Sequence, residues 1–319
     1  MNATLPYLRA EDVEADLSWT AMVDAIAAGH RRPPARIGDL FLTRGDDTML
    51  NRAAWIDGIG IGLKTVSVIG DNATRGLPTV QGVMVVFDDV TGTPKALLDS
   101  ALITYWKTAA DSGLGARHLA RPDSRHLVIL GAGPVAGSLA RVYSALFPRL
   151  ETIGIWNRTP ANAEVLADKL NAEGLHTHAV SDAAEAVGQA DIVACATMAR
   201  EPVLRGDWVR PGTHVDLVGA FRPDMREADD ALLRRARIFV DSRETTLDHI
   251  GELKIPLSAG VITRESILGD FHDLEAGRSG RSDDEEITMF KNGGGAHLDL
   301  MIAEAIIDIW RKKTGTDQP

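Results

Sequence analysis

The stretch that decides the fold is HLVILGAGPVAGSLAR, residues 126–141. An apolar, strand-like run ends at Leu130, a glycine-rich turn follows, and a helix-like segment comes next. The pattern G-x-G-x-x-G/A is a weak signal alone, but between a strand and a helix it predicts a dinucleotide-binding turn. Gly131 would permit the tight turn, Gly133 would let the backbone approach a pyrophosphate, and Ala136 would keep the helix close to the strand.

From residue 126 onward, strand-like and helix-like runs alternate, which is typical of a parallel sheet. The strand-like runs are HLVIL, TIGIW, HTHAV, DIVACAT, THVDLVG and RIFVD. The helix-like runs are PVAGSLARVYSALF, PANAEVLADKLNAEG, DAAEAVGQA and MREADDALLRRA. These runs predict an α/β fold with a Rossmann-like, doubly wound sheet of six strands.

The residues before this sheet predict an N-terminal α+β domain. We expect a helix over 11–30, a meander of about five antiparallel strands, and a linking helix over 104–120. The strand-like runs are RIGDLFL, TMLNRAAWI, GIGLKTVSVI, TVQGVMVVFD and PKALLDSALI. Near the end of the chain we expect a helix in 262–277 and a longer one over 295–313, whose apolar stripe needs the first domain as its partner. The predicted domains are therefore 1–115 with about 294–319, and 116–293.

Bulk properties exclude several classes of protein. The chain has 319 residues and a net charge of −11, which gives no electrostatic footprint for nucleic acid or an anionic membrane. The N-terminus does not resemble a secretory signal, and no apolar run approaches the ~18 residues of a membrane span. Cys195 is the single cysteine, as expected of a chain in a reducing cytoplasm, and we interpret it as a small buried strand residue. No Cys/His cluster or HExxH motif suggests a metal site.

The end of the second strand of the parallel sheet indicates which dinucleotide binds. An NAD-binding chain usually carries Asp or Glu there, whereas TIGIW is followed by Asn157-Arg158-Thr159. Because Arg158 can pair with a 2′-phosphate, we expect NADPH to be preferred, with NADH possible but weaker. The expected cofactor-binding residues are Thr108, Gly131, Ala132, Gly133, Pro134, Val135, Ala136, Asn157, Arg158, Thr159, Thr197, Val218, Gly219, Ala220 and Gly293.

The chain as a whole resembles the ornithine cyclodeaminase/mu-crystallin family. The segments that carry the resemblance are GLKTVSV, GLPTVQGVMVVFD, ALITYWKTAADSGLGARHLA, LGAGPVA, IWNRTPANAE, DLVGAFRPDMREADD and EITMFKNGGGA. The resemblance implies a homodimer built by the N-terminal domain, with the substrate held between that domain and a nicotinamide cofactor. The first 125 residues are then the substrate and dimerisation domain.

Family substrates are α-amino or α-imino acids whose carboxylate is held by cations. By position these cations correspond to Arg36, with Arg44 as the alternative, and to Lys64 and Lys107. Three converging cations in an acidic protein need an anionic ligand, which agrees with that correspondence. Lys107 stands where most relatives carry Arg, and Thr79 matches a position close to the substrate.

Phe221 stands where ornithine cyclodeaminases carry Asp, and a phenyl ring cannot pair with the ammonium of ornithine. The chain therefore resembles the ketimine-reductase branch. That resemblance implies NAD(P)H-dependent reduction of Δ1-pyrroline-2-carboxylate to L-proline, with Δ1-piperideine-2-carboxylate, reduced to L-pipecolate, as a second candidate substrate. Lys64, or a water beside it, is the candidate proton donor, and Lys107 would help to fix the carboxylate. The alternatives are an ornithine cyclodeaminase, an alanine- or opine-type dehydrogenase, and a non-catalytic binding protein like the mu-crystallins.

Overall fold

The computed structural model describes residues 5–315, and the chain forms two compact units. Unit 1 contains the chain up to Lys107 and again from Gly295, and unit 2 is the continuous segment Thr108–Gly294. The first boundary falls inside helix α3 (Ser100–Leu119), earlier in the chain than the expected boundary after residue 115. Unit 2 is therefore an insertion between two parts of unit 1.

Unit 1 is built on a six-stranded sheet of order β1-β6-β5-β4-β3-β2. Its strands are β1 (Tyr7–Leu8), β2 (Arg36–Arg44), β3 (Asp47–Ile56), β4 (Gly60–Val68), β5 (Val80–Phe87) and β6 (Pro94–Asp99). Strands β2 to β6 form the expected antiparallel meander, and β1, which the sequence pattern did not reveal, adds in parallel to β6. The fifth expected strand was too long, because α3 begins at Ser100.

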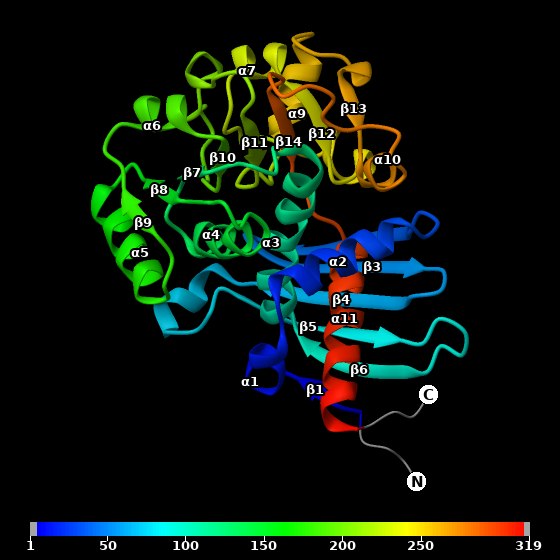
Figure 1. Ribbon diagram of the computed structural model, residues 1–319. Helices are drawn as coiled ribbons and strands as arrows, with labels where there is room; N and C mark the ends of the chain where they lie inside the picture. The colour runs from blue at the N-terminus through cyan, green and yellow to red at the C-terminus, as the bar shows by residue number, and fades with distance from the viewer. Residues whose placement is uncertain (1–4, 316–319) are drawn as a thin grey trace. The chain divides into compact units, whose positions relative to one another are not determined.

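Helices cover one face of this sheet. The C-terminal helix α11 (Ala296–Thr314) packs on strands β2 to β5 and on α2 (Trp19–His30), as the red helix in Figure 1 shows. The single helix expected over 11–30 is wrong. The segment forms α1 (Ala10–Val13), the 3-10 turn η1 (Glu14–Asp16) and then α2, because Ser18 is extended and its hydroxyl caps the Ala21 N–H. A second 3-10 segment, η2 (Gly70–Arg75), lies between β4 and β5.

Unit 2 contains an eight-stranded, wholly parallel sheet of order β13-β12-β14-β11-β10-β7-β8-β9. Its strands are β7 (His126–Leu130), β8 (Thr152–Trp156), β9 (Thr177–Ala179), β10 (Ile192–Cys195), β11 (His214–Leu217), β12 (Arg237–Val240), β13 (Ile267–Gly269) and β14 (Thr288–Lys291). This confirms the Rossmann-like fold and its six expected strands. Two further strands extend the sheet, and β14 inserts between β11 and β12.

Helices and short turns connect these strands. They are α4 (Pro134–Leu146), α5 (Pro160–Ala172), α6 (Ala183–Gln189), η3 (Gly206–Trp208), α7 (Asp230–Arg235), α8 (Arg243–Thr246), α9 (Gly251–Ser258), η4 (Arg264–Ser266) and α10 (Phe271–Glu275). Helix α7 begins later than expected, because Asp229 caps it. The helix expected in 262–277 is wrong, since this segment is divided among η4, β13 and α10.

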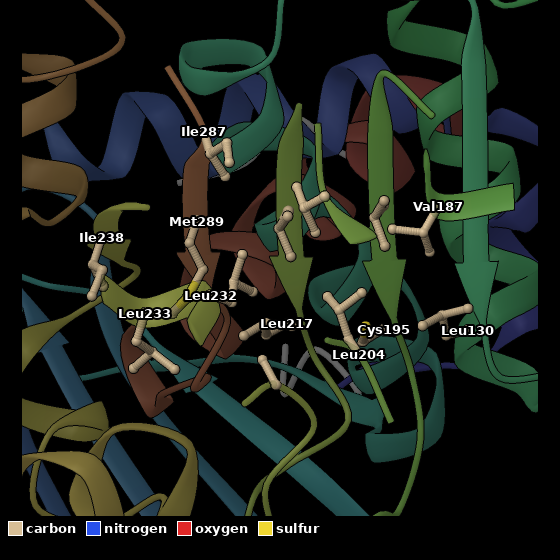
Figure 2. Close-up of a cluster of buried hydrophobic side chains, with 14 of the residues drawn as sticks. Leu130, Val187, Cys195, Leu204, Leu217, Leu232, Leu233, Ile238, Ile287 and Met289 are labelled. Carbon is tan, nitrogen blue, oxygen red and sulfur yellow. The ribbon is translucent and has the colours of Figure 1, made fainter. Parts of the chain in front are cut away.

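A large cluster of buried apolar side chains packs on one face of the parallel sheet. Figure 2 shows this cluster, which includes Leu130, Cys195, Leu217 and Met289. Cys195 is completely buried in it, and burial raises the pKa of its thiol well above the usual value. The thiol is therefore a packing group, as its strand position indicates. Within residues 5–315, no helix is both long enough and apolar enough to cross a membrane.

Candidate functional site

The turn between β7 and α4 has the geometry of a phosphate-binding loop. Gly131 has a φ of +125°, and a Cβ there would lie 2.4 Å from the Ala196 carbonyl oxygen, so only glycine fits. Gly133 is the N-cap of α4, and a Cβ there would meet no protein atom within 4 Å. Packing of the protein therefore does not require glycine at 133, whereas a ligand lying against the backbone would. The helix has no side-chain cap and no acidic residue in its first turn, which suits a pyrophosphate.

The neighbouring strand β8 ends in a short polar turn. The Asn157 side chain accepts the Thr159 N–H at 2.9 Å, and Arg158 between them is exposed. Within residues 5–315, Arg158 makes no hydrogen bond or ion pair, and none of the three residues is acidic. The turn thus presents a positive charge to solvent at the position where NAD-binding chains usually carry a carboxylate.

A buried carboxylate joins the loops that follow β10 and β11. Glu227 Oε1 accepts the backbone N–H and the hydroxyl of Thr197, both at 2.7 Å. Its Oε2 accepts the N–H groups of Gly219 at 2.6 Å and Ala220 at 3.2 Å. These loops carry four of the expected cofactor-binding residues, and Glu227 binds three of them, so it fixes the backbones of the two loops relative to each other.

A second carboxylate, from Glu252 in α9, supports Glu227. Its two oxygens accept the backbone N–H groups of Glu227 at 2.7 Å and Ala228 at 3.0 Å. Burial, and then the nearby charge of Glu227, raise the pKa of Glu252 to about 7. Both residues are completely buried, so this arrangement is part of the interior rather than of the ligand surface.

The expected cofactor residues of unit 2 gather at one edge of the parallel sheet. Residues 131–136, 157–159, 197 and 218–220 follow the carboxyl ends of β7, β8, β10 and β11. Gly293 follows β14 and donates its N–H to Asp241 Oδ2 at 2.9 Å. Thr108, in α3, accepts a hydrogen bond from the Asn292 side chain at 2.9 Å through its carbonyl oxygen. In doubly wound folds this edge is where dinucleotides bind.

In unit 1, Lys64 lies on the face of the sheet that the helices cover. Its Nζ is 2.7 Å from the Asp299 carboxylate of α11 and 3.4 Å from the Thr104 hydroxyl of α3. Burial lowers the pKa of Lys64, Asp299 opposes this effect, and the charges of Lys107 and Arg52 add to it. Lys64 is therefore a desolvated cation with one acidic partner and two cationic neighbours.

Lys107 on α3 is the second buried lysine of unit 1. It is only 9% exposed, and within residues 5–315 it has no hydrogen-bond or ion-pair partner. A buried ammonium without a partner is costly unless a ligand supplies an anion. Because its charge acts on Lys64, the two expected catalytic lysines are brought together.

The structure does not bring Arg36 or Arg44 to these lysines. The Arg36 side chain is 71% exposed and pairs with Asp57 at 2.9 Å, and by strand alternation it lies on the opposite face of the sheet from Lys64. Arg44 is also exposed and pairs with its hairpin neighbour Asp47. Thr79 precedes β5, and its carbonyl oxygen accepts the Ile69 N–H, which closes the β4–β5 connection.

Sequence reasoning missed Arg52, which does lie beside Lys64. In the register of the sheet, Arg52 of β3 stands directly opposite Lys64 on one side and Asp39 of β2 on the other. The Arg52 guanidinium binds the Asp39 carboxylate at 3.0 Å, and both side chains are about three-quarters buried. The sequence did hold a signal for this contact. If the two strands of the hairpin are paired residue by residue on either side of the turn at Gly58, Arg52 falls opposite Lys64, because both are equally distant from that glycine.

Phe221 lies in unit 2, directly after Ala220 in the loop that follows β11. Its ring is exposed in the described structure, while Ala220 before it is completely buried. An exposed phenyl ring at the carboxyl edge of the sheet is available to pack against a ligand rather than against the protein core.

The parallel sheet and its glycine turn define a Rossmann-type dinucleotide-binding protein, with a second α+β unit that carries a buried cationic cluster. Residues 43–314 match the ornithine cyclodeaminase/mu-crystallin family, and the chain belongs to that family.

Three relatives extend this result. The chain is 58% identical over 301 residues to a Δ1-pyrroline-2-carboxylate reductase of Paracoccus denitrificans, which covers 94% of this chain and 95% of the relative. The fold of this chain matches that of the Thermococcus litoralis Δ1-pyrroline-2-carboxylate reductase in complex with NADH and L-proline, with a TM-score of 0.89, 29% identity and 98% coverage of both chains. It also matches the iminosuccinate reductase of Paracoccus denitrificans in complex with NAD+, with a TM-score of 0.89, 27% identity and 98% coverage of both chains.

Proposed function

We propose that this protein reduces Δ1-pyrroline-2-carboxylate to L-proline, and the six-membered Δ1-piperideine-2-carboxylate to L-pipecolate, with a nicotinamide cofactor. The observation that carries the proposal is the buried, unpartnered Lys107 beside the Lys64–Asp299 pair, which calls for a small carboxylate ligand. The similarity to reductases of Δ1-pyrroline-2-carboxylate identifies an acid of that kind.

The glycine turn of unit 2 fits the cofactor. The uncapped N-terminus of α4 and the open space at Gly133 would hold the pyrophosphate, and the Thr197 and Gly219–Ala220 loops would lie against the rest of the dinucleotide. When bound, the reduced nicotinamide supplies a hydride to the imine carbon. Because Arg158 is unpaired and no carboxylate replaces it, NADPH is the preferred form and NADH the weaker one.

Lys107 orients the substrate through its carboxylate. A carboxylate beside Lys107 gains an ion pair in a desolvated environment, and the ammonium gains a partner that residues 5–315 do not provide. Fixing the carboxylate also fixes the C=N bond of the ring, because the carboxylate is attached directly to the imine carbon. A substrate held in this orientation reacts faster, because binding has already brought the reacting groups into the correct geometry.

Lys64 is the proton donor to the ring nitrogen, directly or through a water. Reduction of C=N adds a hydride to carbon and a proton to nitrogen, so a donor is required. Burial lowers the pKa of Lys64 and makes its proton easier to transfer. Asp299, at 2.7 Å, holds the ammonium in place and stabilises its return to the charged form.

The protein acts as a homodimer through the uncovered face of the unit 1 sheet. On strands β2, β3 and β4, five large apolar side chains are exposed on that face, and they alternate with the residues that point toward α11. They are Leu40, Leu42, Met49, Trp55 and Leu63. An exposed apolar patch of this kind on a sheet is typical of a subunit interface.

The test is steady-state turnover of one preparation with a panel of substrates: the two cyclic imines, pyruvate with ammonia, and L-ornithine. We expect reduction of the cyclic imines and no release of ammonia from ornithine, because Phe221 stands where ornithine cyclodeaminases carry Asp and a phenyl ring cannot pair with an ammonium. Phe221→Asp should impair imine reduction by adding a negative charge to an enzyme whose substrate is itself an anion, while Phe221→Leu is the matched apolar control.

Each rival activity has its own signature in this panel. Comparable turnover of ornithine would indicate a cyclodeaminase, and preference for pyruvate with ammonia would indicate an alanine-type dehydrogenase. Tight NADPH binding without turnover of any substrate would indicate a binding protein. Any of these three results would overturn the proposed reaction.

A further inference from the structure

The cationic cluster of unit 1 contains a pair that the proposed reaction does not use. Arg52 and Asp39 lie on neighbouring strands of the face that carries Lys64, and they bind each other at 3.0 Å. A guanidinium is the group best suited to bind a carboxylate through two parallel hydrogen bonds. Here, Asp39 already occupies it, since the Nε atom of Arg52 is also 3.1 Å from Asp39 Oδ2.

The charges of the cluster nearly cancel. Arg52 is balanced by Asp39 and Lys64 by Asp299, which leaves the charge of Lys107. In this desolvated cluster, the charge of Lys107 can neutralise one negative charge of a ligand. A second negative charge on the ligand would be buried without a cationic partner. The side chains of Arg52 and Asp39 retain 24% and 26% of their exposure, so a ligand can reach the pair.

We propose that the Arg52–Asp39 pair determines substrate specificity by leaving the cluster with a single uncompensated positive charge, so that it accepts imino acids with one carboxylate and rejects those with two. This inference rests on the proposed function for the location of the substrate carboxylate. Asp39 acts on the ligand through Arg52, because it occupies the guanidinium that a second carboxylate would need. The charges of Lys107 and Arg52 both lower the pKa of Lys64, so a ligand that binds this cluster meets all three cations.

The experiment compares binding of two amino acids by calorimetry in the presence of NAD+. L-Proline carries one carboxylate and L-aspartate carries two. We expect Asp39→Asn to free Arg52 and to improve the affinity for aspartate relative to proline by about tenfold. Asp47→Asn is the matched control, because it breaks the Arg44–Asp47 pair of the same hairpin, and it should leave the ratio unchanged.

A second pair of variants separates charge from packing. Arg52→Met leaves Asp39 unpaired beside the ligand and should weaken proline binding by about tenfold. The double variant Asp39→Asn/Arg52→Met restores the original charge balance and should recover proline binding while aspartate stays weak. An unchanged ratio in Asp39→Asn, no recovery in the double variant, or no binding of either amino acid by the wild-type protein would overturn the inference.

The binding experiment is independent of the reaction. If the wild-type protein fails to reduce the cyclic imines but the affinity ratio shifts as expected, the proposed function fails and the specificity role of Arg52 and Asp39 stands. If the imines are reduced and the ratio does not move, the specificity role fails alone.

Discussion

The carboxylate of Glu252 accepts the backbone N–H of Glu227 at 2.7 Å, and both side chains are completely buried. Glu227 in turn accepts hydrogen bonds from the loops after β10 and β11, so two acidic residues in series hold the carboxyl edge of the Rossmann sheet. The backbone N–H groups of these loops are shielded from water and need hydrogen-bond acceptors inside the protein. The two buried carboxylates provide these acceptors.

Glu227→Gln tests whether this arrangement matters for the cofactor. The amide would place an N–H donor against a backbone N–H, and each unsatisfied buried group costs about 1–3 kcal/mol. We expect the dissociation constant of the nucleotide, measured by fluorescence titration of folded protein, to rise about tenfold. Glu164→Gln, an exposed change on α5, is the control. A lower melting temperature with unchanged nucleotide affinity would restrict Glu227 to a purely structural role.

Arg158→Ala should change the preference between the two nicotinamide cofactors. Removing the only cation of the β8 turn should weaken NADPH by about tenfold and leave NADH nearly unchanged, because only NADPH carries the 2′-phosphate. The two dissociation constants are measured side by side. Equal losses for both cofactors would place the phosphate elsewhere.

Lys64→Met should reduce imine turnover by at least about 100-fold, since it removes the proposed proton donor. Nucleotide binding should survive, because Lys64 belongs to unit 1 and the nucleotide turn to unit 2. Lys95→Met is the control, as Lys95 forms a comparable ion pair with Glu304 in the same unit. Turnover near the wild-type rate in Lys64→Met would assign the proton to another donor.

The uncovered sheet face predicts the effect of a charge at Leu40. Leu40→Glu places a carboxylate within the apolar patch and should convert the dimer to a monomer in light scattering at micromolar concentration. Val165→Glu alters an apolar residue on α5 that is even more exposed than Leu40, and it should leave the dimer intact. A monomeric wild-type protein would contradict the proposed interface.

The stability of the protein should depend on pH through Asp216 of β11. This carboxyl is completely buried, it accepts the Tyr143 hydroxyl at 2.9 Å, and burial raises its pKa from 3.8 to about 7. Since the folded-state pKa lies above the unfolded-state value, the native protein binds the extra proton, and its stabilising effect is lost as the pH rises through 7.

Asp216→Asn should therefore flatten the loss of stability between pH 4 and 7. The difference in slope between variant and wild type should approach about 1.4 kcal/mol per pH unit, the effect of one proton. Urea unfolding at several pH values measures it. Parallel profiles for the two proteins would mean that Asp216 stays ionised in the native state.

Sequence patterns predicted the Rossmann unit well because its buried strands are short apolar runs bounded by turns, as in HLVIL and RIFVD. They failed where the structure depends on distant pairing. Strand β14 enters the sheet between β11 and β12, although the segment TMFK carries no signal of that position. The break between α1 and α2 follows from the Ser18 cap, which competes with a continuous apolar stripe.

The candidate site shows the same division. The glycine turn is a local motif, so residues 131–136 could be recognised from the sequence alone. Lys64 was recognised by its position in a family segment, whereas its partner Asp299 lies 235 residues away. Arg52 and Glu227 act through hydrogen bonds between elements that are separate in sequence, and local periodicity does not indicate such contacts.

The insertion of unit 2 into unit 1 has a consequence for the biosynthesis of the protein. During translation, the segment Thr108–Gly294 emerges as one continuous piece and can fold before α11 has emerged. Unit 1 cannot complete its folding before α11 is available, because this helix covers its sheet and supplies Asp299 to Lys64. A nascent chain that stops before Gly295 would thus present a finished nucleotide unit and a sheet with an uncovered core. The cationic cluster is complete only after α11 has been synthesised and has packed on the unit 1 sheet.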